Sequence, residues 1–135
     1  MPFVLCADFS IFPDNHVLGP AFTLAAMDFT DHPAGTQPSF VNETAGVLAL
    51  QFSDPGLEVE LPPLAMPSRL WMRVGAFAGP FDIDALDVSG NAIAKRHVLL
   101  LNVFHTVSFR QPDIARLVFS GGKNEGLIAS ICAYV

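Results

Sequence analysis

The chain has 135 residues, of which 51% are hydrophobic, and a formal net charge of -6. This length predicts one domain, spanning residues 1–135, that buries enough surface to fold without metal ions or disulfide staples. The seven Lys and Arg residues are scattered and form no basic cluster in the sequence, so we expect no nucleic-acid partner. No apolar run approaches the ~20 residues of a membrane-spanning helix, so we expect no membrane span.

The mean hydropathy of +0.44 is high for a soluble monomer. Two arrangements accommodate it: strands that are buried on both faces, or a surface that partner subunits cover. The second arrangement predicts a homo-oligomer. The first residues, MPFVL, lack the charged and long apolar regions of a signal peptide, so we expect either a chain that is not secreted or a mature form.

Eleven prolines and ten glycines divide the chain into short runs rich in Val, Ile, Phe and Leu, the pattern of an all-β protein. The segment 91–104 also contains good helix formers, but the Ser89-Gly90-Asn91 turn and the β-rich neighbours favour a strand. In chain order, the predicted strands are residues 5–12, 21–29, 39–42, 46–52, 57–61, 69–77, 81–87, 92–100, 105–110, 115–120 and 126–134.

The alternation of apolar and polar residues predicts which side chains of several strands share a face. In LEVEL (57–61) the apolar side chains face one way and Glu58 and Glu60 the other, and FDIDA (81–85) repeats this pattern. RLWMRVGAFA and GLIASICAYV are apolar on both faces, which predicts strands covered on both sides. So many short strands in one domain predict a sandwich or barrel, and the long connection 31–38 favours Greek-key or jelly-roll topology.

Three stretches, CADFS (6–10), FDIDALDVSGN (81–91) and IARLVFSGGKNEGLIASIC (114–132), resemble bacterial galactose-binding-like domains, which have the jelly-roll fold of carbohydrate-binding modules. The resemblance covers most of the chain. It implies a single-domain jelly-roll β-sandwich of about eight to ten strands. It also implies a non-catalytic carbohydrate-binding or adhesive role, with a glycan as the expected partner.

The resemblance bears on the two cysteines as well. The terminal strands of such domains often lie side by side, so Cys6 and Cys132 are candidates for a disulfide, with two buried thiols as the alternative. A disulfide here would close a very long loop and would indicate an oxidising, extracellular compartment. Without it, the localisation stays open.

Galactose-binding-like domains often hold a structural calcium near the last strand. Glu125 and Asn124, with Asp8 as a further carboxylate, are therefore the candidate calcium ligands. The alternative is a solvated turn that launches the last strand, in which Asn124 adopts a left-handed conformation and Glu125 faces water.

Trp71 is the strongest candidate for a ligand contact, because an exposed Trp on a sheet is the usual platform for stacking a sugar ring. In RLWMRV it shares its predicted face with Arg73 rather than with Leu70, Met72 and Val74. Trp71 and Arg73 are therefore the candidate glycan-binding residues. The alternative places Trp71 in the core.

No G-x-S-x-G, H-E-x-x-H or P-loop signature occurs, so we expect no enzyme. Three functions stay open: a binding or adhesion module, a self-assembling subunit such as a fibre, shell or tight oligomer, and a small β-barrel enzyme. His97 or His105 would be the base of the enzyme. A hairpin turning near Leu101 would make these two histidines face each other, as a shared zinc site requires, although no third or fourth ligand is evident. Phe104 and Tyr134 are further candidate contact aromatics.

Overall fold

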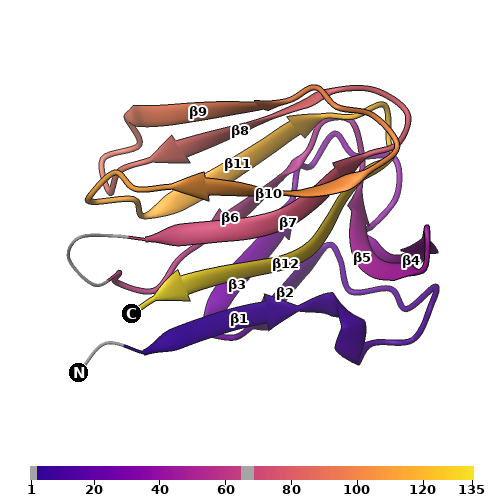
Figure 1. Ribbon diagram of the computed structural model, residues 1–135, viewed down its shortest axis with the longest axis horizontal. Coiled ribbons are helices and arrows are strands. Elements are labelled where there is room, and N and C mark those ends of the chain that lie inside the picture. The colour runs from indigo at the N-terminus through magenta and orange to yellow at the C-terminus, as the bar shows by residue number, and fades with distance from the viewer. Residues whose placement is uncertain (1–2, 65–68) are drawn as a thin grey trace.

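The computed structural model describes residues 3–64 and 69–135. Within them, twelve strands and one short 3-10 turn, η1 (Phe9–Ile11), form two six-stranded antiparallel sheets that pack against each other (Figure 1). The all-β sandwich predicted from the sequence is therefore confirmed, with more strands than the eight to ten expected.

Sheet A has the strand order β10-β7-β12-β5-β4, and β1 pairs with the second half of β12. The first and last strands thus lie side by side, and two main-chain hydrogen bonds between Phe3 and Val135, of 3.1 and 2.9 Å, join the ends of the chain. The strands of sheet A are β1 (Val4–Asp8), β4 (Phe40–Thr44), β5 (Val47–Phe52), β7 (Leu70–Ala76), β10 (Phe104–Phe109) and β12 (Gly126–Tyr134).

Sheet B has the strand order β2-β3-β6-β11-β8-β9. The chain crosses repeatedly between the sheets, for example through the long connection from β3 to β4, as a jelly roll requires. The strands of sheet B are β2 (Ala21–Leu24), β3 (Met27–Asp31), β6 (Leu57–Glu60), β8 (Phe81–Leu86), β9 (Ala92–Val98) and β11 (Arg116–Gly121).

The core lies between the sheets and is built from alternate residues of each strand. On β6, Leu57 and Val59 are buried while Glu58 and Glu60 are exposed, as the alternation of LEVEL predicts. Aromatic rings fill much of the core, which suits a sandwich because each ring buries a large apolar area. The fully buried phenylalanines are Phe9, Phe29, Phe52, Phe81, Phe109 and Phe119.

Strand β12 is buried on both of its faces. On the outer side of sheet A, Leu127 and Ala129 join Ala49 in a second apolar cluster, which Phe77 and Phe104 cover together with Val47. This cluster accounts for part of the high hydropathy without any partner subunit.

The segment predicted as one strand, 21–29, is a hairpin. Leu24 pairs with Met27, so Ala25 and Ala26 form a two-residue turn in which both have positive φ, 52° and 58°. Such a turn normally carries Asn-Gly, because other residues lose energy at positive φ. The sequence Ala-Ala gave no turn signal, and the prediction of a single strand is wrong for that reason.

The expected pairing of the segments 92–100 and 105–110 is also wrong. β9 pairs with β8 in sheet B, whereas β10 pairs with β7 in sheet A. His97 lies 2.5 Å from Asp82 on β8, and His105 lies opposite Val74, whose side chain is buried in the core. The two histidines therefore do not face each other, which removes the argument for a zinc site that they share.

Candidate functional site

Strand β7 presents two different faces. Leu70, Met72 and Val74 are completely buried in the core, whereas Trp71 is partly exposed and Arg73 fully exposed. Because successive residues of a strand point to opposite sides, Trp71 and Arg73 lie on the outer face of sheet A. Arg69 is exposed and lies just before β7. It precedes Trp71 by two positions, so it faces the same side of the sheet as Trp71.

Trp71 is held in place by two neighbours. The ring of Tyr134 lies 5.7 Å from it, measured between centroids and tilted by 55°, and the guanidinium carbon of Arg69 lies 5.6 Å from its ring centre. Both contacts limit the rotation of the indole, since aromatic and cation–π pairs favour defined geometries. A ring fixed in this way loses little side-chain entropy when a ligand stacks on it.

Short polar side chains lie beside Arg69, Trp71 and Arg73, which we call the β7 row. Trp71 pairs with Ser108 on β10, and Arg73 pairs with Thr106 on β10 and Ser130 on β12. Directly opposite residues of an antiparallel pair share a face, so these three hydroxyl groups surround the row. Each hydroxyl can donate one hydrogen bond and accept two, which suits the hydroxyl groups of a polar ligand.

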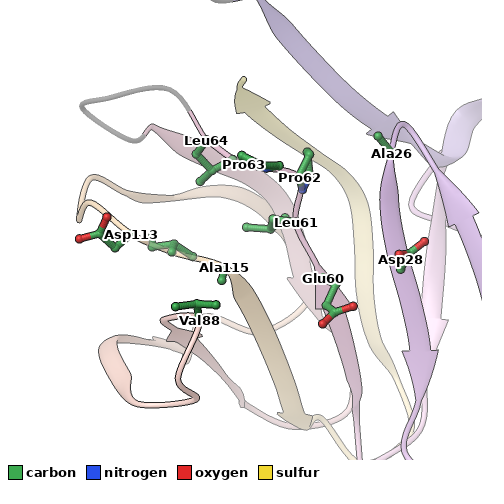
Figure 2. Close-up of a pocket in the computed structure, with 11 residues that line it drawn as sticks. Ala26, Asp28, Glu60, Leu61, Pro62, Pro63, Leu64, Val88, Asp113 and Ala115 are labelled. Atoms are coloured by element: carbon green, nitrogen blue, oxygen red, sulfur yellow. The ribbon is translucent and has the colours of Figure 1, made fainter.

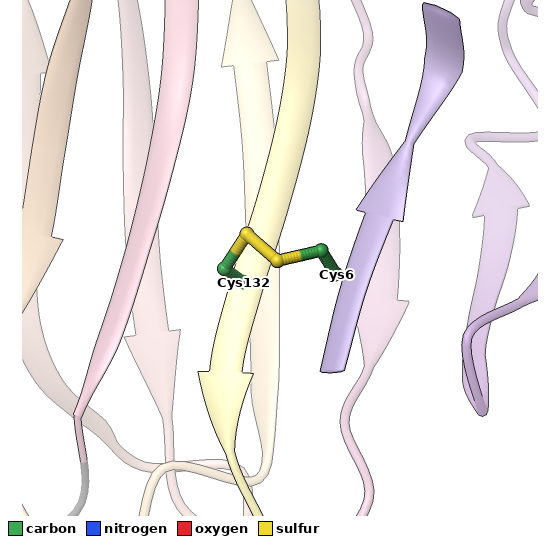
Figure 3. The surroundings of a disulfide bond; sticks show 2 residues. All are labelled: Cys6 and Cys132. Atoms are coloured by element: carbon green, nitrogen blue, oxygen red, sulfur yellow. A yellow bond between two sulfur atoms is a disulfide. The ribbon is translucent and has the colours of Figure 1, made fainter. Parts of the chain in front are cut away.

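A disulfide between Cys6 and Cys132 lies beside this row. Cys6 on β1 pairs with Cys132 on β12 (Figure 3). Cys132 pairs in turn with Trp71 on β7. The Cα atoms of the two cysteines are 4.1 Å apart, a separation that directly opposed residues of an antiparallel pair provide. The bridge therefore fixes β1 at the edge of the outer face that carries Trp71.

The candidate calcium ligands lie apart. Asn124 has φ 68°, and its amide oxygen accepts a 2.8 Å hydrogen bond from the backbone N–H of Asp54, so it shapes the loop before β12. Glu125 is exposed and immediately precedes that strand. Asp8 pairs with Ser130, five residues further along and thus roughly 15 Å away along the strand, and its carboxylate accepts from the N–H of Ser10.

Among residues 3–64 and 69–135, no three His, Cys, Asp or Glu side chains lie close enough to hold one metal ion. No helix in this described part has the length and apolar character to span a bilayer.

A hollow lies elsewhere, at one end of sheet B. It has a volume of about 710 Å³ and is lined by the segment that follows β6, by Val88 in the β8–β9 turn and by the residues just before β11 (Figure 2). Three carboxylates line it, Asp28, Glu60 and Asp113. Thr23 donates to Asp28 at 2.6 Å and Arg116 donates to Glu60 at 3.3 Å, whereas Asp113 is exposed. The remaining lining is largely apolar, with Leu61, Pro62, Pro63, Leu64 and Ile114 among its residues.

Several solved structures resemble this chain. The TM-score is 0.56 for "CBM29_1, A Family 29 Carbohydrate Binding Module from Piromyces equi", at 10% sequence identity over 98% of this chain and 90% of that one. It is 0.52 for "BiXyn10A CBM1 APO", at 14% identity over 96% of each chain. The chain has a carbohydrate-binding-module-like β-sandwich fold. This likeness concerns the fold alone, and no protein-family model or curated protein sequence matches the chain.

Of the candidate residues, the structure brings Trp71 and Arg73 together on one face and places the cysteines in a bridge next to them. The sequence analysis did not single out Arg69. The signal was present, since Arg69, Trp71 and Arg73 follow each other at the two-residue spacing of one strand face.

Proposed function

We propose that the chain is a non-catalytic glycan-binding module and that the glycan binds on the outer face of sheet A around Trp71. The observation that carries this proposal is the partly exposed Trp71 on that face, supported from the side by Tyr134 at 5.7 Å. An aromatic ring of this kind offers a flat apolar surface to the apolar side of a sugar ring. The β-sandwich fold shared with carbohydrate-binding modules supports the same function.

The hydroxyl groups around the row support this choice of ligand. Thr106 and Ser108 are exposed, so a sugar can exchange their hydrogen bonds to water for hydrogen bonds to its own hydroxyl groups. An open sheet face also suits an extended polymer. The polymer chain continues beyond both ends of the site and would not fit into a closed pocket. The hollow at the end of sheet B has mainly apolar walls and no aromatic ring among the described residues that line it, and two of its three carboxylates already have partners, so it fits a glycan less well.

We also propose that the protein works in an oxidising, extracellular environment. The disulfide between Cys6 and Cys132 supports this, because disulfides persist in such compartments and are rare where thiols are kept reduced.

The experiment is a glycan array followed by calorimetry with each glycan that binds. We expect Trp71→Ala to weaken binding by roughly 10-fold or more and to keep a cooperative unfolding transition, because a stacking aromatic contributes on the order of 1–3 kcal/mol. Val118→Ala, on the outer face of sheet B, is the control and should bind as the wild type does. Wild-type affinity in Trp71→Ala, or no binding to any glycan, would contradict the proposal.

A second candidate function, a self-assembling subunit and hence a homo-oligomer, is favoured by one observation. The loop between β9 and β10 exposes four apolar residues close together, with exposed fractions of 68% for Leu99, 61% for Leu100, 44% for Leu101 and 39% for Val103. Contiguous exposed apolar residues often mark a contact between proteins.

Light scattering tests this second candidate. If the loop mediates assembly, the wild type has a multiple of the 14.5 kDa chain mass, and the double variant Leu99→Ser/Leu100→Ser falls to the mass of one chain. Ile11→Ser is the control, because Ile11 is 67% exposed outside this loop. A wild type that stays at the mass of one chain at high concentration excludes assembly.

A further inference from the structure

We propose that the bound glycan is anionic and that Arg69 and Arg73 bind its carboxylate or sulfate groups. This inference rests on the glycan-binding function proposed above and names the substrate class of the same site. It follows from the charges on the outer face of sheet A, which differ from those on the outer face of sheet B.

Within residues 3–64 and 69–135, neither arginine has a carboxylate partner. The ion pairs of the described residues involve Lys95, His97 and Arg116, all of them on sheet B, and none involves Arg69 or Arg73. The residues outside the described ranges are Met, Pro, Ala and Ser, which supply no carboxylate side chain. In a chain with a net charge of -6, two exposed arginines without a counter-charge on one face are unexpected.

Asp8, a carboxylate on the same face of sheet A, forms no ion pair with either arginine. Asp8 lies in register with Ser130, which lies in register with Arg73, so the two backbones are two strands apart, roughly 10 Å. The carboxylate of Asp8 instead caps the 3-10 turn by accepting from Ser10. The two arginines therefore create a local positive potential on this face.

The arginines flank the stacking platform and are already oriented. Each is two positions from Trp71 along the chain, which places their backbones roughly 7 Å on either side of it. Arg69 lies over the ring of Trp71, and the guanidinium carbon of Arg73 lies 5.4 Å from the ring centre of Phe104. These contacts reduce the side-chain entropy that each arginine loses when it binds an anion.

The chemistry of the site selects an anion over a neutral sugar. A guanidinium presents N–H donors in a planar fork that matches a carboxylate or a sulfate, and such charge-assisted hydrogen bonds are stronger than neutral ones. A neutral glycan stacked on Trp71 would partly remove both guanidiniums from water and give them no counter-charge in return. The site would therefore bind the neutral form more weakly.

The test compares matched pairs of oligosaccharides by calorimetry. One pair is an oligogalacturonide and its fully methyl-esterified form, and the other is a sulfated oligosaccharide and its desulfated form. We expect at least one anionic member to bind roughly 10-fold or more tightly than its neutral counterpart at about 0.01 M salt, and the ratio to shrink at about 1 M. The pair that shows the preference identifies the anion as a carboxylate or a sulfate.

Variants locate the effect. Arg73→Gln should weaken the anionic glycan roughly 10-fold and leave the neutral glycan within about 2-fold, while Arg73→Lys keeps part of the preference. Arg69→Gln should weaken the anionic glycan more than the neutral one, and it should weaken both because Arg69 also holds the ring of Trp71. Lys95→Gln removes the same charge from the outer face of sheet B and should change neither affinity.

The outcomes separate the two proposals. If the anionic and neutral glycans bind equally, or Lys95→Gln weakens the anionic glycan as much as Arg73→Gln, the anion preference is overturned and the glycan-binding function stands. If no member of either pair binds the wild type and no glycan on the array does, both proposals are overturned.

Discussion

The outer faces of the two sheets handle charge in opposite ways. On sheet B, cations lie opposite carboxylates of neighbouring strands, as in the 3.4 Å pair between Lys95 and Asp84. On sheet A, Arg69 and Arg73 lie over aromatic rings and have no carboxylate partner among the described residues. Sheet B thus neutralises much of its own charge, whereas sheet A leaves two cations free for a ligand.

This difference teaches that net charge is a poor guide to the partner of a small β-sandwich. The chain carries a charge of -6, yet the face that we assign to binding is locally positive. Paired charges on a solvated sheet face contribute little free energy and mainly keep the face soluble and its edges unpaired. Unpaired charges beside fixed aromatic rings have no such structural role, which makes them the better indication of a ligand.

Removal of the disulfide, which lies on the sheet A face, should have the largest effect. Cys6 and Cys132 are 126 positions apart, so the chain-entropy model expects the double variant Cys6→Ser/Cys132→Ser to lose roughly 4–5 kcal/mol of unfolding free energy. Denaturant titration measures this loss, and the wild type in reductant should reproduce it. An unchanged midpoint in reductant, with two free thiols counted, would show that the bridge does not stabilise the fold.

An intermediate effect is expected at Tyr134, which supports Trp71 from the side. Tyr134→Ala removes the ring at 5.7 Å and should weaken glycan binding by roughly 2- to 12-fold, since an aromatic pair contributes about 0.5–1.5 kcal/mol beyond buried area. Tyr134→Phe keeps the ring and should bind like the wild type. Equal losses in both variants would show that the hydroxyl, and not the ring, contacts the glycan.

The smallest effect is expected on the sheet B face. Arg116 contacts Glu60 at 3.3 Å and Glu58 at 4.0 Å, and all three side chains are substantially exposed. Arg116→Gln should therefore cost less than about 1 kcal/mol of unfolding free energy and leave glycan binding unchanged. Denaturant titration and calorimetry measure the two quantities. A loss of binding in this variant would remove the distinction between the two faces.

The sequence was sufficient to predict the sandwich, because the strands follow a two-residue alternation that is clear in the run 57–61. For Trp71 it left two alternatives, the outer face and the core, because the run 69–77 is apolar on both faces. The structure places Leu70, Met72 and Val74 in the core and Trp71 on the outer face. The proximity of Cys6 and Cys132 came only from the resemblance to jelly-roll domains, since pairing across 126 positions leaves no local signal.

Other features had no readable signal. The turn at Ala25 and Ala26 depends on positive φ values that alanine does not favour, so tertiary packing imposes it. β9 and β10 lie in different sheets because the chain crosses the sandwich between them. Two adjacent apolar runs have the same sequence pattern whether the chain crosses between the sheets or forms a hairpin within one sheet. Among the described residues Arg73 has no carboxylate partner. The sequence could not show this, because it depends on where each carboxylate lies in the folded chain.

The central claim is that a glycan binds over Trp71, and the fluorescence of Trp71 tests it. Trp71 is the single tryptophan of the chain, so intrinsic emission reports on this face and on nothing else. We predict that a glycan found to bind by calorimetry shifts the emission saturably, with the same dissociation constant. Calorimetric binding with no change in emission would contradict the account and would place the glycan elsewhere, with the hollow beside Leu61 as the next surface to test.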